Sequence, residues 1–302
     1  YMQMGMRWIS FGMAYSTEWN GSPDCGHFLG GALQYGQDTS MPICALALAA
    51  GSREFDPAIA GMSAEETRHV CRKGLRYLLF THDTGPEDCI RPQKGWNGAP
   101  GADKWGAKWG ERGRGFFKES QCGRTISFMA ITAAMIADLL SEEERGMLAA
   151  VAEDYAGRFA QMPPKSGVYV NTQMEENAWT ALGLASCLCL LPHHPERDTW
   201  EKGMKRWFFC TATMPRDRKN QAEIEPGVTI GQMTGTTFTA LPDCTNENHG
   251  MVHPGYLGSS IVLGGYALNV LNLYGQPVPK HALRHRDTMY ATLKNWTMEA
   301  GD

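Results

Sequence analysis

The sequence contains no CxxC pair, no apolar run of about 18 residues and no excess of basic side chains. A zinc ribbon needs paired CxxC motifs and a membrane-spanning helix needs the long apolar run, so neither is expected. The 28 lysines and arginines are outnumbered by 32 aspartates and glutamates, which leaves a net charge of -4. That balance gives no electrostatic reason to expect nucleic acid as a partner. We expect neither nucleic acid nor a membrane as partner.

A disulfide framework is also missing. The nine cysteines are an odd number and have no framework spacing. Cys187 and Cys189 lie in the apolar run ALGLASCLCLL, where a free thiol behaves as a small hydrophobic group. This usage favours a reducing compartment such as the cytoplasm. The chain begins at Tyr1 without a signal-peptide pattern, and we interpret it as a fragment or trimmed chain. A secreted or periplasmic location therefore stays open.

Strand patterns are scarce, whereas helical patterns run along most of the chain. Ser63 with Glu66, and Ser141 with Glu144, have the spacing of capping boxes and predict two helix starts. Amphipathic helices are expected at 63–83, 141–162, 195–214 and 278–296. Helices apolar on nearly every side, and therefore buried, are expected at 124–140, 176–191 and 258–275, with an earlier helix in 41–56. The plausible strands are confined to 167–172 and 227–240.

The order of these helices repeats as polar loop, buried helix, short turn and amphipathic helix. Such hairpins predict an inner and an outer helical layer, as in an all-α (α/α) toroid, an incomplete barrel of helical hairpins with few short strands. A helical solenoid is the alternative, but its repeats would be shorter and more equal in length. We predict one toroid domain covering residues 1–302.

Three polar loops precede the expected inner helices. They are FFKESQCGRT (116–125), VYVNTQMEENAW (168–179) and TNENHGMVHPGY (245–256). If the inner helices are parallel, these loops converge at one mouth of the ring, where helix N-termini favour an anionic ligand. The candidate site residues from these loops are Gln121, Arg124, Glu176, Asn177, Asn246, Glu247, Asn248, His249, His253 and Tyr256.

A long glycine-rich loop at 95–117 contains Trp105 and Trp109. Long loops inside compact domains are usually functional, and indole faces stack on the apolar faces of sugar rings. The alternative is that the tryptophans pin the loop to the body of the protein. Both interpretations stay open, and we take Trp105 and Trp109 as candidate substrate-binding residues.

Two other chemistries fit the sequence less well. His249 and His253 are four residues apart, but Gly250 and Pro254 exclude the helix that would place both rings on one side, so no metal site is predicted. His281 and His285 share the spacing on an expected helix, where solvent exposure is the simpler account. Cys122 lacks a cysteine-protease signature and is expected to be a buried thiol. No cofactor is required, although a structural divalent metal stays open.

Carbohydrate chemistry fits the polar loops best. Eliminative cleavage of a uronic-acid glycan needs a group that neutralises the substrate carboxylate, a base and an acid. Asparagine or arginine suits the first task, and histidine and tyrosine suit the others. Hydrolysis would instead need two carboxylates across the scissile bond. Glu175, Glu176 and Glu247, with Asp243 in reserve, could supply them.

The sequence resembles the α/α-toroid polysaccharide lyases of the heparinase II/III-like and alginate-lyase-like grouping. The resemblance is carried by the buried helix pairs and by the segments EENAWTALGLA and CTNENHGMVHPGY. The resemblance covers about residues 60 to 296 and is architectural over most of that length. It implies that Asn248 and His249 form the Asn-His pair before an inner helix and that Tyr256 is a catalytic acid or base. No β-sandwich of the kind that follows the toroid in those lyases can be placed here. Inverting glycoside hydrolases and unsaturated-glucuronyl hydrolases share the toroid.

The expectation is therefore a lyase that cleaves a uronate-containing glycan. Tyr256 and His249 would be base and acid in either order, with Asn248 and Arg124 neutralising the carboxylate. His253, Glu176 and Asn177 would position the glycan. An inverting hydrolase using Glu176 and Glu247 is one alternative, and a non-catalytic helical-repeat binder of glycan or protein is the other. Which glycan is cleaved, the endo or exo mode and the oligomeric state are left open.

Overall fold

The computed structural model describes residues 2–22, 24–167 and 169–296. It is mostly helical with few short strands, which confirms the all-α prediction. The chain divides into two compact units, Tyr1–Tyr155 and Ala156–Asp302. The boundary falls within one helix, α7 (Glu142–Phe159). A single toroid domain over residues 1–302 stays a prediction.

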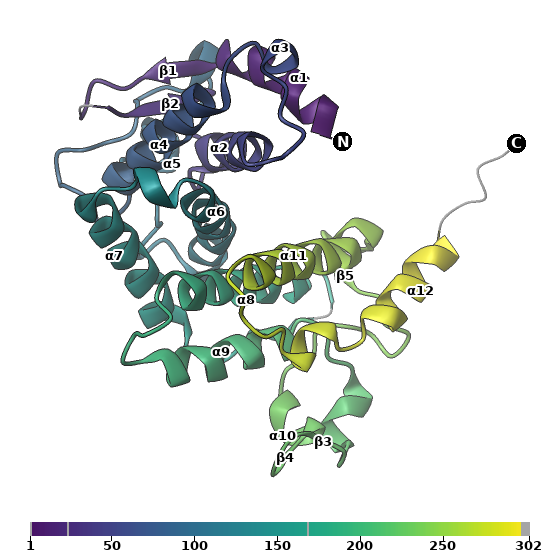
Figure 1. Ribbon diagram of the computed structural model, residues 1–302. Helices are drawn as coiled ribbons and strands as arrows, with labels where there is room; N and C mark the ends of the chain where they lie inside the picture. The colour runs from purple at the N-terminus through teal and green to yellow at the C-terminus, as the bar shows by residue number, and fades with distance from the viewer. Residues whose placement is uncertain (1, 23, 168, 297–302) are drawn as a thin grey trace, which may run out of the picture. The chain divides into compact units, whose positions relative to one another are not determined.

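The first unit is a small helical assembly around α2 (Gln37–Ala50). This helix packs against α1 (Met2–Met13), α4 (Ala64–Thr81) and α6 (Phe116–Met135) (Figure 1). The remaining elements of the unit are β1 (Ser16–Glu18), β2 (Gly26–Phe28), α3 (Pro57–Ala60), η1 (Trp96–Gly98), α5 (Ala102–Trp105) and η2 (Ala137–Leu139). β1 and β2 form an antiparallel hairpin, and β2 packs against α4.

The capping predictions in this unit are confirmed. The Ser63 hydroxyl accepts from the Glu66 N–H at 3.1 Å, while the Glu66 carboxylate accepts from the Ser63 N–H at 2.8 Å. Ser141 and Glu144 exchange the same pair of bonds at 3.2 and 2.6 Å. These reciprocal bonds satisfy N–H groups that would otherwise lack partners at each helix start.

The predicted loop at 116–125 is wrong, because α6 begins at Phe116. Gln121 and Arg124 therefore lie inside a helix. The start has a local cause: the Glu119 carboxylate accepts from the N–H groups of Gly113 and Gly115 at 3.1 and 3.2 Å. A carboxylate at a helix N-terminus also interacts favourably with the helix dipole.

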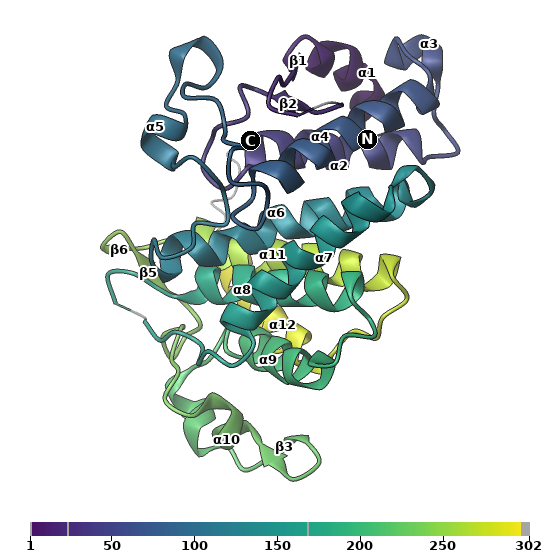
Figure 2. The same ribbon diagram turned by 90° about the vertical axis from the view of Figure 1, so that its left-hand side faces the viewer.

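The second unit is built around α8 (Met174–Leu190), which packs against α9 (Arg197–Phe209) and α11 (Pro254–Leu273). α11 also packs against α12 (Arg286–Trp296). The other elements are η3 (Pro215–Lys219), β3 (Glu223–Glu225), β4 (Val228–Thr229), α10 (Ile230–Thr234), β5 (Glu247–Asn248), β6 (Met251–Val252) and η4 (Lys280–Leu283). Within this unit α8 is followed along the chain by α9, and α11 by α12. Figure 2 shows β3 and α10 projecting below α9.

Two helices were expected to be buried on all sides in this unit, and they differ. In α8 nearly every residue from Glu176 to Cys189 is buried, as predicted. In α11 the buried side carries Leu257, Leu263 and Val270, but Val262 is 52% exposed. The expectation of burial on all sides is therefore wrong for α11.

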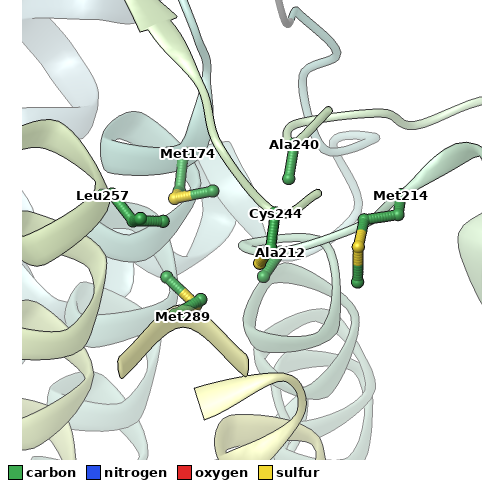
Figure 3. Close-up of a cluster of buried hydrophobic side chains, with 7 residues drawn as sticks. All are labelled: Met174, Ala212, Met214, Ala240, Cys244, Leu257 and Met289. Atoms are coloured by element: carbon green, nitrogen blue, oxygen red, sulfur yellow. The ribbon is translucent and has the colours of Figure 1, made fainter. Parts of the chain in front are cut away.

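A sulfur-rich core joins the starts of α8 and α11 (Figure 3). Met174 is the first residue of α8, and Leu257 lies in the first turn of α11. Between them pack Met214, Cys244 and Met289, with Ala212 and Ala240. Because methionine side chains adapt to irregular spaces, this core can support a loop of irregular backbone directly above it.

The predicted helix at 278–296 is broken. η4 ends at Leu283, His285 adopts a left-handed conformation (φ 58°), and α12 begins at Arg286. Asp217, which is buried, accepts a hydrogen bond from the Arg284 guanidinium and lies 3.1 Å from His285 Nε2. The expectation of solvent-exposed histidines is wrong, because His281 is buried and His285 is paired with Asp217.

The predicted strands are only partly present. In 227–240 the strand is limited to Val228–Thr229 and gives way to α10. In 167–172, Asn171 forms an isolated bridge with Asn248, and Val168 lies outside the described residues. Of the helices in the described part of the chain, none has the length and apolar character needed to cross a bilayer.

Candidate functional site

The stretch TNENHGMVHPGY contains a tight β-hairpin followed at once by a helix. Asn248 pairs with Met251, so His249 and Gly250 form a two-residue turn. Both have positive φ, 54° for His249 and 79° for Gly250, as a type I′ turn requires. Histidine is among the non-glycine residues that tolerate this region better than most. The turn holds the exposed His249 side chain at the tip of the hairpin.

Tyr256 meets this histidine from the first turn of α11. The helix begins with Pro254, whose missing N–H costs nothing at that position, and His253 is its N-cap residue. The Tyr256 hydroxyl lies 2.8 Å from His249 Nε2, and the two rings are 5.4 Å apart at 70°. The His253 ring packs edge-on against Tyr256 at 4.8 Å. A hydrogen-bonded histidine–tyrosine pair thus stands at the junction of hairpin and helix.

The loop before α8 lies directly against this hairpin. Asn171 bridges Asn248, the Gly250 N–H donates to the Val170 carbonyl at 3.0 Å, and the Thr172 N–H donates to the Glu247 carbonyl at 2.8 Å. Two of the three polar loops singled out in the sequence are therefore in contact within the second unit. Figures 1 and 2 show β5 beside the beginning of α11.

The backbone of His249 is held by two asparagines. Its N–H donates to Asn248 Oδ1 at 3.1 Å and lies 3.4 Å from Asn171 Oδ1. Asn248 is 6% exposed, and the atom that holds the His249 backbone is its amide oxygen, not its amide nitrogen. Asn171 was not among the predicted site residues. Its place in the polar loop VYVNTQMEENAW was the available signal.

Glu247 has a mainly structural contact. One oxygen of its carboxylate, Oε2, accepts from the Val170 N–H at 2.9 Å and ties the loop before α8 to the hairpin. The residue is half-buried. The same contact helps to hold the loop before α8 in place beside the hairpin that carries His249.

Glu176 is the buried carboxyl of the site. It is 6% exposed, and among the described residues no donor is bonded to its Oε2. Burial raises the pKa of Glu176 to about 7, against a small lowering from a backbone hydrogen bond. Burial also raises the pKa of Tyr256, and the carboxylates of Glu175 and Glu176 raise it further. Tyr256 is therefore held as a proton donor at neutral pH.

Two predicted substrate-binding residues are structural instead. Asn177 is fully buried, and its side chain donates to the carbonyls of Lys165 and Cys210 and accepts from the Lys165 N–H. Asn246 is also fully buried, with its amide nitrogen 3.6 Å from Met174 Sδ in the sulfur-rich core. Neither side chain reaches the surface where a glycan would bind, so both assignments are wrong.

Asp243, held in reserve as a carboxylate, stabilises the turn that leads into the hairpin. Its Oδ1 accepts from the N–H and the hydroxyl of Thr245 at 3.0 and 2.7 Å. These hydrogen bonds lower its pKa. The arrangement is that of an Asx-turn, which explains the residue without a catalytic role.

The first unit contains the other predicted site residues. Trp109 is fully buried, and its indole N–H donates to the Leu78 carbonyl at 2.7 Å, so its predicted stacking on sugar is wrong and the pinning alternative holds. Trp105 is half-buried beside Lys104. Gln121 is buried and Arg124 half-buried, with the Arg124 guanidinium over the Phe128 ring. The convergence of Arg124 with His249 stays a prediction, because the two lie in different units.

An apolar rim lies on the hairpin that carries His249 and on the loop that contacts this hairpin. It consists of Tyr169 and Val170 from the loop before α8 and of Met251 and Val252 from β6, all strongly exposed. Tyr169 is the largest of these side chains and is 69% exposed. Exposed apolar side chains gathered beside polar groups are typical of a ligand-binding surface. The short strands gave no periodic signal from which this rim could be predicted.

In residues 2–22, 24–167 and 169–296, no group of three or more histidine, cysteine, aspartate or glutamate side chains is placed to hold a metal ion. Cys122 is buried, as expected. Comparison of the chain with protein-family models, curated proteins and solved structures found no match.

Proposed function

We propose that this protein is a carbohydrate-active enzyme of the α/α-toroid type that cleaves a uronate-containing glycan by β-elimination. The observation that carries the proposal is the 2.8 Å contact between His249 Nε2 and the Tyr256 hydroxyl, at an exposed hairpin tip next to a helix N-terminus. The packing of α8 against α11 on one side and α9 on the other supports the inner and outer layers of a toroid.

The two side chains suit the two proton transfers of the reaction. The base removes the C5 proton, the electron pair forms the C4–C5 double bond, and the acid protonates the oxygen that leaves C4. Because its pKa is raised, Tyr256 is the acid in our proposal and His249 is the base. The hydrogen bond between them lets the proton return from histidine to tyrosine after each turnover.

The substrate carboxylate must be neutralised for the C5 proton to become acidic. The Asn248 amide nitrogen is next to His249 and is suited to donate to that carboxylate. The N-terminus of α11 adds a partial positive charge at the same place. Arg124 is the further cation that we predict for this role. Tyr169 and the rest of the apolar rim would contact the faces of the sugar rings.

The test is a panel of uronate polymers and oligosaccharides scanned for the ultraviolet absorbance of the new double bond. The wild-type protein should generate this absorbance with at least one substrate. Tyr256→Phe and His249→Asn should each lower kcat at least 100-fold, the scale of a lost general acid or base. Tyr290→Phe and His193→Asn, exposed residues of the same unit, are matched controls that should keep full activity. Full activity in both site variants would refute the assignment.

Inverting hydrolysis is the second candidate, and the buried Glu176 favours it specifically. A carboxyl whose pKa is about 7 is protonated enough to act as a general acid near neutral pH. Glu247 would be the partner carboxylate. Hydrolysis releases reducing ends without the double bond, so measuring both products on one substrate separates the two reactions. If reducing ends are released without the ultraviolet absorbance of the double bond, the protein is a hydrolase and the lyase proposal is wrong.

A further inference from the structure

The first unit contains an apolar cavity that the lyase proposal does not use. It measures about 400 Å³ and lies between α1 and the start of α2. Trp8, Leu29, Leu33, Met41 and Pro42 form most of its wall. A second cavity of about 300 Å³ shares Trp8, Leu29 and Pro42 with the first and continues to Tyr15 and Trp96. These volumes are in the range of small-molecule sites.

One carboxyl group, that of Asp38, stands in this apolar wall. Asp38 is 4% exposed, and its Oδ2 accepts from the Leu33 N–H at 2.9 Å. Its other oxygen, Oδ1, has no hydrogen-bond partner among the described residues. A buried carboxylate oxygen without a donor is costly, so a donor brought by a ligand would be strongly favoured at this position.

The charged groups around Asp38 do not supply that donor. Arg91, whose charge lowers the pKa of Asp38, is buried and donates to the carbonyls of Gly106 and Lys108, with Glu111 at 3.8 Å. The other titratable neighbour is Tyr77, whose hydroxyl donates to the Gly31 carbonyl at 2.5 Å. Burial raises the pKa of Asp38 to about 7, and hydrogen bonds from the backbone N–H groups of Leu33, Thr39 and Asp38 itself, together with the Arg91 charge, only reduce that rise.

Aromatic rings gather on the same side of the cavity pair. Tyr15 meets Trp96 edge-on at 5.2 Å and lies 5.0 Å from Phe11, while Trp8 lines both cavities. Indole and phenol faces attract ammonium groups through their quadrupoles. A single acidic group in an aromatic cavity therefore selects a cation attached to an apolar body, and repels an anion.

We propose that this cavity binds an organic amine with an aromatic or aliphatic body, its ammonium group donating to the Asp38 carboxylate. The body of the amine would fill the space between Trp8, Leu33 and Met41. This site lies entirely within the first unit and is independent of the histidine–tyrosine site of the second. If the amine proposal fails, the lyase proposal is unaffected. If the lyase proposal fails, the amine proposal is unaffected.

The test is calorimetric titration of the full chain at pH 8 with three probes of similar size: phenethylamine, 2-phenylethanol and 3-phenylpropionate. The amine should bind at least ten-fold more tightly than the alcohol, and the carboxylate should bind weakest. Because the amine requires ionised Asp38, its affinity should fall up to ten-fold for each pH unit below about 7. Equal binding of amine and alcohol, or a preference for the carboxylate, would overturn the proposal.

The variant Asp38→Asn should weaken amine binding at least ten-fold and leave binding of the alcohol unchanged. Glu54→Gln removes the same charge from an exposed position of the unit and should change neither. Circular dichroism checks that both variants are folded. Unchanged amine affinity in a folded Asp38→Asn protein would refute the site. The three-probe comparison on the wild-type chain decides the question even if that variant does not fold.

Discussion

At the scale of single residues, His249 meets two demands at once. It carries an imidazole to the proposed site, and it occupies a left-handed turn position that alanine adopts only with strain. His249→Ala should therefore lose about 1 kcal/mol of unfolding free energy relative to His249→Asn, because asparagine tolerates that conformation. Urea unfolding of the two variants measures the difference. Equal midpoints would mean that the turn is not left-handed in solution.

Glu176 makes stability depend on pH. Its pKa is about 7 in the folded protein and near 4.5 when unfolded, so the folded state holds its proton more tightly. That contribution is complete below pH 4.5 and disappears as the pH rises through 7, a change on the order of 3 kcal/mol. Glu176→Gln should abolish this loss and be more stable than wild type at pH 8. Urea unfolding across that pH range measures it, with the exposed Glu223→Gln as a control that should follow the wild type.

At the scale of elements, the ends of helices were harder to predict than their existence. The Ser63–Glu66 pair predicted its helix start because the cap is encoded within four residues. The break before α12 was not predictable in this way, since Asp217 lies 67 residues from Arg284 in the chain. Only the folded unit brings that carboxylate to the left-handed turn at His285.

The same carboxylate gives a prediction at this scale. Burial would raise the pKa of Asp217, but hydrogen bonds from His285 and the Met214 N–H and the charge of Arg284 outweigh it and hold the pKa low. Its contribution is present above about pH 3.8 and is lost as the pH falls through the lower folded pKa. At neutral pH Asp217→Ala should cost about 3–5 kcal/mol, because Arg284 is left buried without a counter-charge. Asp198→Ala, at an exposed position, should cost less than about 1 kcal/mol in the same thermal or urea melts.

The hairpin of the site shows the same limit of prediction. The density of polar residues and the resemblance to toroid lyases drew attention to Asn248, His249 and Tyr256, which the structure does bring together. The hairpin itself was missed because β5 and β6 have two residues each, too few to show an alternating pattern. The burial of Asn246 and Asn177 could not be predicted either. An asparagine in a polar segment looks the same in the sequence whether its side chain is buried or binds a substrate.

At the scale of the whole molecule, hydrophobic periodicity predicted the helical class and most of the hairpins. It could not say which polar segments meet, because that depends on contacts between residues far apart in the chain. Only for the loop before α8 and the β5–β6 hairpin do the described contacts answer the question, and there they touch.

The cysteines give a prediction for the whole chain. All nine are buried free thiols, and burial raises the pKa of Cys44, Cys189 and Cys210 to about 12. A disulfide reagent should therefore label almost none of them in the native protein and all nine in denaturant, because thiolates form only after unfolding. Thiol titration with and without denaturant measures this. Rapid labelling of several thiols under native conditions would contradict the burial.

The hydrogen bond between His249 and Tyr256 spans only seven residues of chain. Because the entropy lost in closing a loop grows with the length of the loop, little conformational entropy is lost in bringing these two rings together. Chain connectivity, more than distant packing, keeps the proton donor beside the proton acceptor. A local opening elsewhere in the second unit would therefore leave the two rings within reach of each other.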